Sequence, residues 1–229
     1  MNKIKYIAPV LIAIACLGLQ QAKAVTTYTL TAGNSALTGA GFTGPYGTAT
    51  VTLGAGGTTA TVTFTASTQI IGGTTFQYMF GDGSSVAVNT NGAASVSGIS
   101  GTCVGCVGIT PGGYTAAGSG NVDGFGVLNQ TIDDFDGFTH AATVVTFTLT
   151  KTSGTWASDA SVLIANANGA SVAAHIFVTT SPPNASSSAN VTGFAANTGA
   201  VNTPDGGTTV MLLGAALGAL GMARRFVMS

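Results

Sequence analysis

The segment ATVVTFTLT, at Ala142–Thr150, is the clearest strand signal in this chain. Apolar residues alternate with threonine along it, so that an extended strand would have one apolar face and one polar face. The segment TATVTFTA, at Thr59–Ala66, shows the same alternation. Because a period of two residues is typical of a strand and not of a helix, both segments predict half-buried strands within an all-β fold.

Shorter segments of the same character extend this prediction. Glycine-rich turns separate them, and two of these turns, Gly54–Gly57 and Gly81–Gly83, predict β-hairpins. Short strands joined by frequent turns predict a single antiparallel β-sandwich or jelly-roll-like domain. The further strands expected are Thr26–Leu30, Ala49–Leu53, Thr74–Phe80, Ser84–Val88 and Ala173–Val178.

One short helix is expected at Ala160–Asn166, because Ser158 or Asp159 can cap its N-terminus. The following polar segment contains two adjacent prolines and is expected to be a linker or the region of a last strand, residues 181–202. The β-rich domain is therefore assigned to residues 25–180.

Charge is scarce between the two ends of the chain. Residues 25–202 contain one lysine, Lys151, with six aspartates and neither arginine nor glutamate. A nucleic-acid-binding surface needs clustered basic side chains, so the composition excludes that class of protein. Solubility must come instead from threonine, serine, asparagine and glycine.

The N-terminus has the pattern of a secretory signal peptide, residues 1–24. Two lysines precede a short apolar stretch, and Ala22 and Ala24 form an A-x-A site for cleavage by signal peptidase. Cys16 leaves a lipoprotein signal as an alternative. The pattern predicts an exported protein, and it makes the β-rich domain an ectodomain.

The C-terminal segment, residues 203–229, combines a turn, an apolar stretch and a basic end. Proline and glycines predict an exposed turn at its start. Residues 208–223 carry no charge and predict a transmembrane helix, somewhat short for a hydrocarbon core of roughly 30 Å. Two arginines follow, as in a positive-inside stop signal. A buried C-terminal helix is the alternative, but its glycines and terminal arginines argue against it.

This arrangement resembles the PEP-CTERM class of bacterial sorting signals, and within it the variant whose motif reads Val-Pro-Asp-Ser-Gly. Two of the five motif positions depart from that variant, and the resemblance covers the tail alone. It implies that an exosortase-type membrane protease cuts near the motif, and that an inner-membrane intermediate then reaches the surface or the surroundings of a Gram-negative bacterium. The residues that carry the resemblance are Thr203, Pro204, Asp205, Gly206, Gly207, Arg224 and Arg225.

Cys103 and Cys106 form a CxxC pair in a glycine-rich loop. In the oxidising compartment that export implies, we expect these two residues to form a small structural disulfide. A redox site would place the pair at a helix N-terminus, and a zinc site would need two further ligands. Both remain alternatives.

Four aspartates precede the strongest strand. Carboxylates gathered in a loop suit Ca²⁺, so the sequence raises a calcium site as the only cofactor expectation. No EF-hand pattern is present, and solvated turn aspartates are the competing interpretation. The residues are Asp123, Asp133, Asp134 and Asp136.

No motif indicates catalysis. A Gly-x-Ser-x-Gly elbow is absent from the sequence, and His140 and His175 are expected to be packed or exposed histidines. A sugar-binding platform could draw on the aromatic residues Phe125, Phe135, Phe138 and Trp156, although core positions are the safer interpretation.

These observations together predict an exosortase-processed cell-surface or extracellular-matrix protein without catalytic activity. A structural or adhesive role in an exopolysaccharide matrix fits the export signals and the uncharged composition. A carbohydrate-binding module and a secreted hydrolase are the alternatives. The expected partners are signal peptidase, an exosortase-type protease, the membrane before processing, and polysaccharide.

Overall fold

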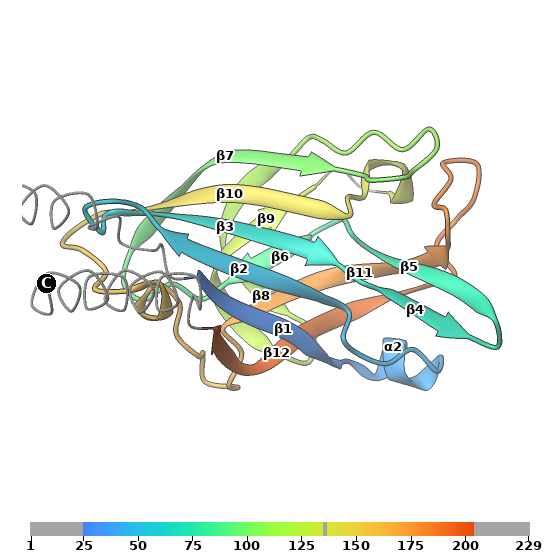
Figure 1. The fold of residues 1–229 in the computed structure, drawn as a ribbon, viewed down its shortest axis with the longest axis horizontal. Helices are drawn as coiled ribbons and strands as arrows, with labels where there is room; N and C mark the ends of the chain where they lie inside the picture. The colour runs from blue at the N-terminus through green and yellow to red at the C-terminus, as the bar shows by residue number, and fades with distance from the viewer. Residues whose placement is uncertain (1–24, 135–136, 204–229) are drawn as a thin grey trace, which may run out of the picture. The chain divides into compact units, whose positions relative to one another are not determined.

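The computed structural model of the chain describes residues 25–134 and 137–203 (Figure 1). The predicted signal peptide and the predicted transmembrane helix at residues 208–223 both lie outside these ranges. Within the described residues, no helix has the length and the apolar character required to cross a membrane.

The described residues form a single antiparallel sheet of twelve strands, which confirms the all-β prediction. Its main path runs β7-β10-β3-β2-β1-β12-β11-β6-β9-β8, while β5 pairs with β11 and β4. The strands are β1 (Val25–Gly33), β2 (Gly47–Leu53), β3 (Thr59–Ala66), β4 (Thr68–Ile71), β5 (Thr74–Phe80), β6 (Val86–Val88), β7 (Ala94–Thr102), β8 (Thr115–Val122), β9 (Gly126–Asp133), β10 (Val144–Lys151), β11 (Val172–Thr180) and β12 (Val191–Thr203).

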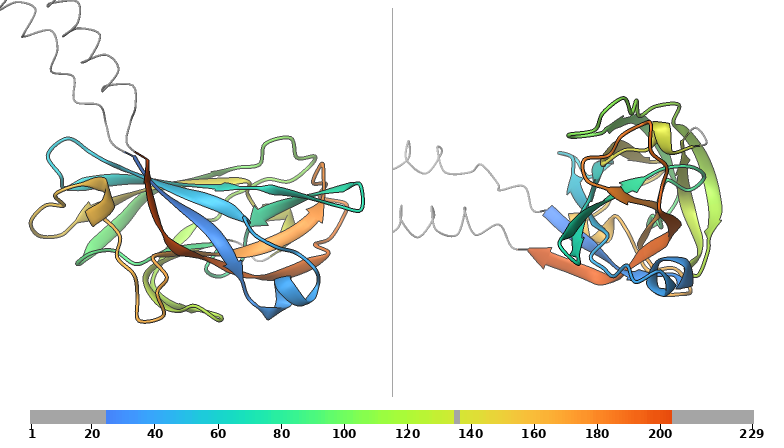
Figure 2. Two further views of the ribbon diagram at one scale, coloured as in Figure 1. Left: turned by 60° about the horizontal axis from the view of Figure 1, so that its bottom comes forward. Right: turned by 90° about the vertical axis from the view of Figure 1, so that its right-hand side faces the viewer.

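The sheet curls until the two end strands of its main path, β7 and β8, approach each other without joining the ladder, so it forms a nearly closed barrel (Figure 2). Each edge strand contains a register irregularity and a glycine at positive φ, Gly98 at 61° and Gly118 at 76°. A bulge of this kind twists an edge and makes it a poor template for pairing with another chain. Both ends of the main path are therefore protected.

The two predicted hairpins have different outcomes. The hairpin at Gly54–Gly57 is confirmed, because β2 and β3 pair along their whole length. The prediction of a hairpin at Gly81–Gly83 is wrong. In the described sheet, β5 pairs with residues 176–180 of β11 and β6 pairs with residues 172–174, so the two strands follow one another along the same neighbour. Residues 81–85 form a loop between them and do not reverse the chain.

The helix predicted at Ala160–Asn166 is also wrong. A single 3-10 turn, η2 (Asp159–Ser161), forms, and the Ser158 N–H donates to the Ser161 Oγ at 3.0 Å. The chain then becomes extended, because Leu163 forms a β-bridge with Thr90 and its side chain is buried. Burial at the end of the barrel outweighs the modest helix propensity of this segment.

The α-helix that does form among the described residues was not predicted from the sequence. Helix α2 (Ser35–Gly39) has five residues and follows β1. It buries the side chain of Leu37 in the main core. A second 3-10 turn, η1 (Phe138–His140), precedes β10.

The main core fills the barrel and is rich in aromatic side chains. The Phe64 ring lies edge-on to Phe80, at 5.9 Å between centroids, and stacks on Phe147 at 6.3 Å. The largest fully buried aromatic side chains are Tyr28, Tyr46, Tyr78, Phe64, Phe80 and Phe147.

Strand β11 is buried on both of its faces. Ala174 and Ile176 belong to the main core, while Ala173 and Phe177 belong to two smaller clusters on the opposite side. The sequence of a strand with two buried faces is a nearly continuous run of apolar residues. This explains why the segment does not alternate with threonine as β3 and β10 do.

The two ends of the described unit lie side by side. Strand β12 is thirteen residues long, and its last residue, Thr203, pairs with Val25, the first residue of β1. The region assigned to a linker or a last strand therefore contains a loop, residues 181–190, followed by most of β12.

We predict that Phe64→Ala lowers the free energy of unfolding by about 3–5 kcal/mol, because it leaves a cavity between two packed rings. Urea denaturation of the exported protein measures this loss. Ile70→Ala is the control: its side chain is 71% exposed, and the change should cost no more than about 0.5 kcal/mol. Equal losses in the two variants would contradict the assignment of this core.

Candidate functional site

Both predicted processing positions adjoin one strand pair. Thr203, the first residue of the predicted sorting motif, ends β12, and Val25 directly follows the predicted signal-peptide cleavage position. The other predicted processing residues lie outside the described residues: Ala22, Ala24, Pro204, Asp205, Gly206, Gly207, Arg224 and Arg225. A cut on either side of the domain would therefore leave the ladder between β1 and β12 complete.

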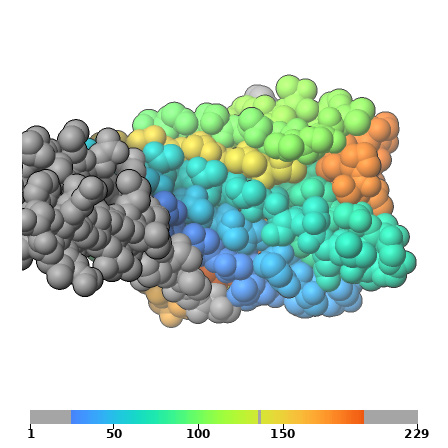
Figure 3. All heavy atoms as spheres, viewed as in Figure 1, coloured from blue at the N-terminus to red at the C-terminus, as the bar shows by residue number. Residues whose placement is uncertain are grey.

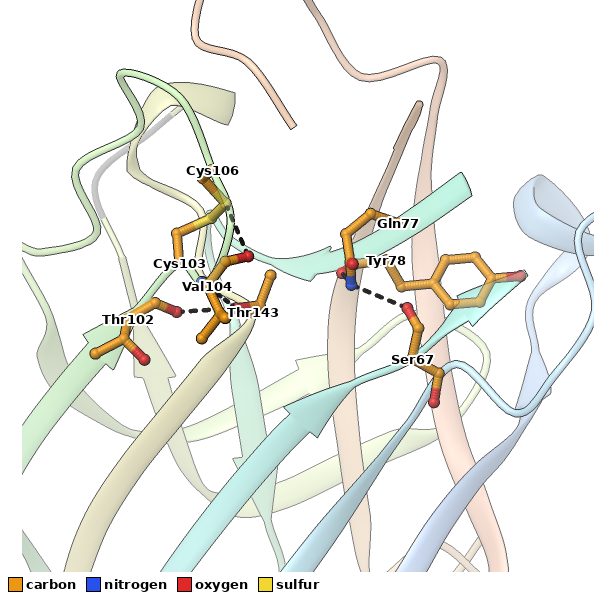
Figure 4. Close-up of a disulfide and its surroundings, with 8 residues drawn as sticks. All are labelled: Ser67, Gln77, Tyr78, Thr102, Cys103, Val104, Cys106 and Thr143. Carbon is orange, nitrogen blue, oxygen red and sulfur yellow. Dashed lines mark hydrogen bonds between the residues drawn. A yellow bond between two sulfur atoms is a disulfide. The ribbon is translucent and has the colours of Figure 1, made fainter. Parts of the chain in front are cut away.

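A disulfide joins Cys103 to Cys106, in the turn that follows β7 (Figure 4). The turn is attached to the start of β10: the backbone N–H of Val104 donates to Thr143 Oγ1 at 2.8 Å, and the Thr143 hydroxyl donates to Thr102 O at 3.2 Å. Both cysteines pack against the cluster that contains Phe177. The bond therefore supports a structural role for the CxxC pair.

The predicted aspartate cluster does not assemble as expected. Asp123 lies in the turn between β8 and β9, whereas Asp133 ends β9, so the eight residues of that strand separate them by on the order of 25 Å. Asp136 lies outside the described residues. Among residues 25–134 and 137–203, no three His, Cys, Asp or Glu side chains are placed to hold a metal ion. The prediction that Asp123 converges with Asp133 and Asp134 was wrong.

The aspartate side chains accept hydrogen bonds that hold loops in place. Asn34 Nδ2 donates to Asp123 Oδ2 at 3.0 Å, which ties the β8–β9 turn to the start of α2. At the other end of β9, the Ser84 N–H donates to Asp133 Oδ1 at 2.7 Å. These contacts give both carboxylates a structural function in the protein itself.

The loop at residues 81–85 is a polar site that sequence reasoning did not find. Asp82 and Ser84 have positive φ values, 59° and 55°, which is unusual for residues with side chains. The Gly137 N–H donates to Asp82 Oδ1 at 2.6 Å, and the His175 N–H donates to Ser84 O at 3.1 Å. The loop is thus held between the start of η1 and the middle of β11.

His175 lies opposite this loop on β11. Its ring stacks on Phe194, at 4.4 Å between centroids and 17° between planes, and lies 5.3 Å from Phe177. Burial lowers the pKa of His175 below its usual 6.5, although the charge of Asp82 and a hydrogen bond to the Gly83 backbone act in the opposite direction. The native state therefore favours the neutral imidazole.

The described residues of the aromatic platform considered from the sequence are buried or partly buried. The Trp156 side chain is 3% exposed, and its Nε1–H donates to Asn91 O at 3.0 Å. Lys151 Nζ lies 5.2 Å from the centre of the indole. Phe125 and Phe138 are partly buried against core clusters, and Phe135 lies outside the described residues. The core interpretation of Trp156 is confirmed.

We predict that Cys103→Ser combined with Cys106→Ser lowers the free energy of unfolding by about 2 kcal/mol, because a short covalent loop no longer restricts the unfolded chain. Denaturation of both proteins under non-reducing conditions gives the difference. Reducing agent should destabilise the wild-type protein by a similar amount and leave the double variant unaffected. A wild-type protein insensitive to reductant would contradict the prediction.

We predict that the free energy of unfolding falls as the pH drops below 6.5 and stops falling below the lowered pKa of His175. In that window the unfolded chain binds a proton that the native imidazole resists. His175→Phe keeps an aromatic ring at this position and removes the titration. The variant should therefore show a flatter pH dependence between pH 6.5 and 5 in denaturant melts. Identical slopes for both proteins would contradict the assignment.

Comparison with known proteins identifies the C-terminal segment. Residues 204–225 match the model of the VPDSG-CTERM motif. No curated protein and no solved structure matches the chain. The motif indicates an exported protein directed to the cell surface, and the predicted variant of the C-terminal signal is confirmed: this chain carries a VPDSG-CTERM sorting motif directly after strand β12.

Proposed function

We propose that this protein is an exosortase substrate that serves, after processing, as a non-catalytic structural or adhesive component of the cell surface or of an exopolysaccharide matrix. The observation that carries the proposal is the VPDSG-CTERM motif at residues 204–225. On this proposal, the motif takes the protein through a membrane-held intermediate to a sorting protease, after signal peptidase has removed residues 1–24.

The boundary between domain and signal supports this order of events. Strand β12 ends at Thr203, and the segment that matches the motif model begins at the next residue. A protease needs an extended substrate that is free of a sheet, and a cut within the motif spares every ladder pair of β12. The domain can therefore be fully folded when the sorting protease acts on it.

The contacts made by the carboxylate, cysteine and histidine side chains support a non-catalytic role. The carboxylates of Asp82, Asp123 and Asp133 accept hydrogen bonds that fix loops, and the two cysteines are joined to each other. The ring of His175 is stacked on Phe194. Groups that often act in catalysis thus serve the fold, which suits a protein whose function is to persist outside the cell.

We predict that wild-type protein recovered from the native cell surface or medium lacks both residues 1–24 and the segment from Met211 onward. Asp205→Ala combined with Pro204→Ala should retain the C-terminal segment and remain in the inner-membrane fraction, because the protease no longer recognises its motif. Fractionation followed by intact-mass measurement tests both expectations. Thr180→Ala, an exposed change on β11, is the control and should be processed normally.

The matrix role has a separate test. In cells that make no exopolysaccharide, the processed protein should be released into the medium, while producing cells should retain it. Equal release from both kinds of cell would refute the matrix role and leave the sorting assignment intact. A wild-type mass that includes Met211–Ser229 would refute the sorting assignment itself.

A further inference from the structure

Threonine occupies the outward positions along four adjacent strands of the barrel, β1, β2, β3 and β10. The residues between them, such as Val62 and Phe147, point into the core and are fully buried. We call this surface the threonine face; it comprises Thr27, Thr29, Thr48, Thr50, Thr52, Thr59, Thr61, Thr63, Thr65, Thr146, Thr148 and Thr150.

The strand register aligns these threonines in rows that cross the sheet. Most threonines of one strand lie directly opposite a threonine of the next, so the face has a repeat in two directions; Val144 takes the position opposite Thr65. The rows are Thr27-Thr50-Thr63-Thr146, Thr29-Thr48-Thr65, Thr52-Thr61-Thr148 and Thr59-Thr150. Ser100 and Ser97 of β7 continue the first and third rows at the edge of the sheet.

The two repeats have fixed lengths. Neighbouring strands lie about 4.8 Å apart, and alternate residues of one strand lie about 6.7 Å apart. Threonine is β-branched, so its χ1 angle is restricted and its methyl and hydroxyl groups keep their directions. The Thr63 and Thr146 hydroxyls are 3.1 Å apart and hydrogen-bonded, which links two strands of the face. The surface is a regular, stiff array of methyl and hydroxyl groups.

The threonine face carries no ionisable side chain. Lys151 lies against Trp156, and the described aspartates lie in loops or at strand ends. Figure 3 shows this side of the protein, where the atoms of β1, β2, β3, β10 and β7 follow one another across the surface. A charged polymer would find no complementary charge here, and a sugar ring would find no aromatic side chain to stack on. The face therefore suits a neutral partner that is itself periodic.

Ice is a neutral solid with this kind of order. In a tetrahedral network with O–H···O distances near 2.8 Å, oxygens that share a neighbour lie about 4.5 Å apart, close to the strand spacing. Hydroxyls at this spacing can take the place of lattice oxygens, while the methyl groups between them hold caged water.

We propose that the threonine face binds ice. The sheet twists by about 20–25° from strand to strand, so the hydroxyl groups match the oxygen spacing of ice best over β3 and its neighbours β2 and β10. Thr50, Thr63 and Thr146 of one row, with Thr61 and Thr148 of the next, form the centre of the contact. The inference concerns the folded domain and does not rest on the proposed function.

The test is partition of the exported, processed protein into slowly growing ice. A growing ice front excludes ordinary solutes, so the wild-type protein should be enriched in the ice fraction relative to an inert protein in the same solution. Thr63→Lys combined with Thr148→Lys places two charges at the centre of the face and should abolish the enrichment. Thr180→Lys, an exposed change on β11 outside the face, should keep it.

Thermal melting confirms that each variant is folded. If the double variant does not fold, Thr61→Lys, at an exposed position of the row that contains Thr148, takes its place and should lose the enrichment. Exclusion of the wild-type protein from ice would overturn the proposal, and so would equal loss in Thr180→Lys. Retention on insoluble cellulose or chitin by a protein that ice excludes would assign the face to polysaccharide instead.

Discussion

The pairing of β1 with β12 is the contact on which the rest of the structure depends. On one side of it lie β2, β3, β10 and β7, and on the other lie β11, β6, β9 and β8. Without this ladder the barrel would separate into two open sheets, each with a long unprotected edge beside the aromatic core. The pairing joins the first strand of the domain to the last, so the barrel is complete only when the whole domain has been made.

The sequence predicted strands well where one face meets the core and the other meets water. β3 has the predicted bounds, because apolar and polar residues alternate there. β5 also has the predicted bounds, although its last three residues are all buried. β7 and β8 were missed, since serine and glycine give an edge strand little apolar character. The Gly81–Gly83 turn was misassigned because the same residues suit a hairpin or a loop. Pairing with β11, a strand distant in the sequence, determines which of the two forms, and the residues of the turn carry no information about that pairing.

The candidate sites show the same division between local and long-range information. The bond between Cys103 and Cys106 follows from their spacing and from the compartment that the export signals imply. The aspartates are neighbours in sequence as well, but β9 runs between Asp123 and Asp133 and carries them apart. The threonines are the reverse case: each strand shows its own alternation, yet only the register of four strands reveals that they form one array.

The position of β12 has a mechanical consequence. If the processed chain is held by its C-terminal end, a pull on the domain acts along β12, parallel to the strand and perpendicular to its ladder hydrogen bonds. β12 pairs with β1 through residues 195–203 and with β11 through residues 191–196, so a pull on its C-terminal end loads the β1 ladder in shear, and the bonds of that ladder share the load instead of opening one after another. A barrel attached through its longest strand is well suited to a tether under tension.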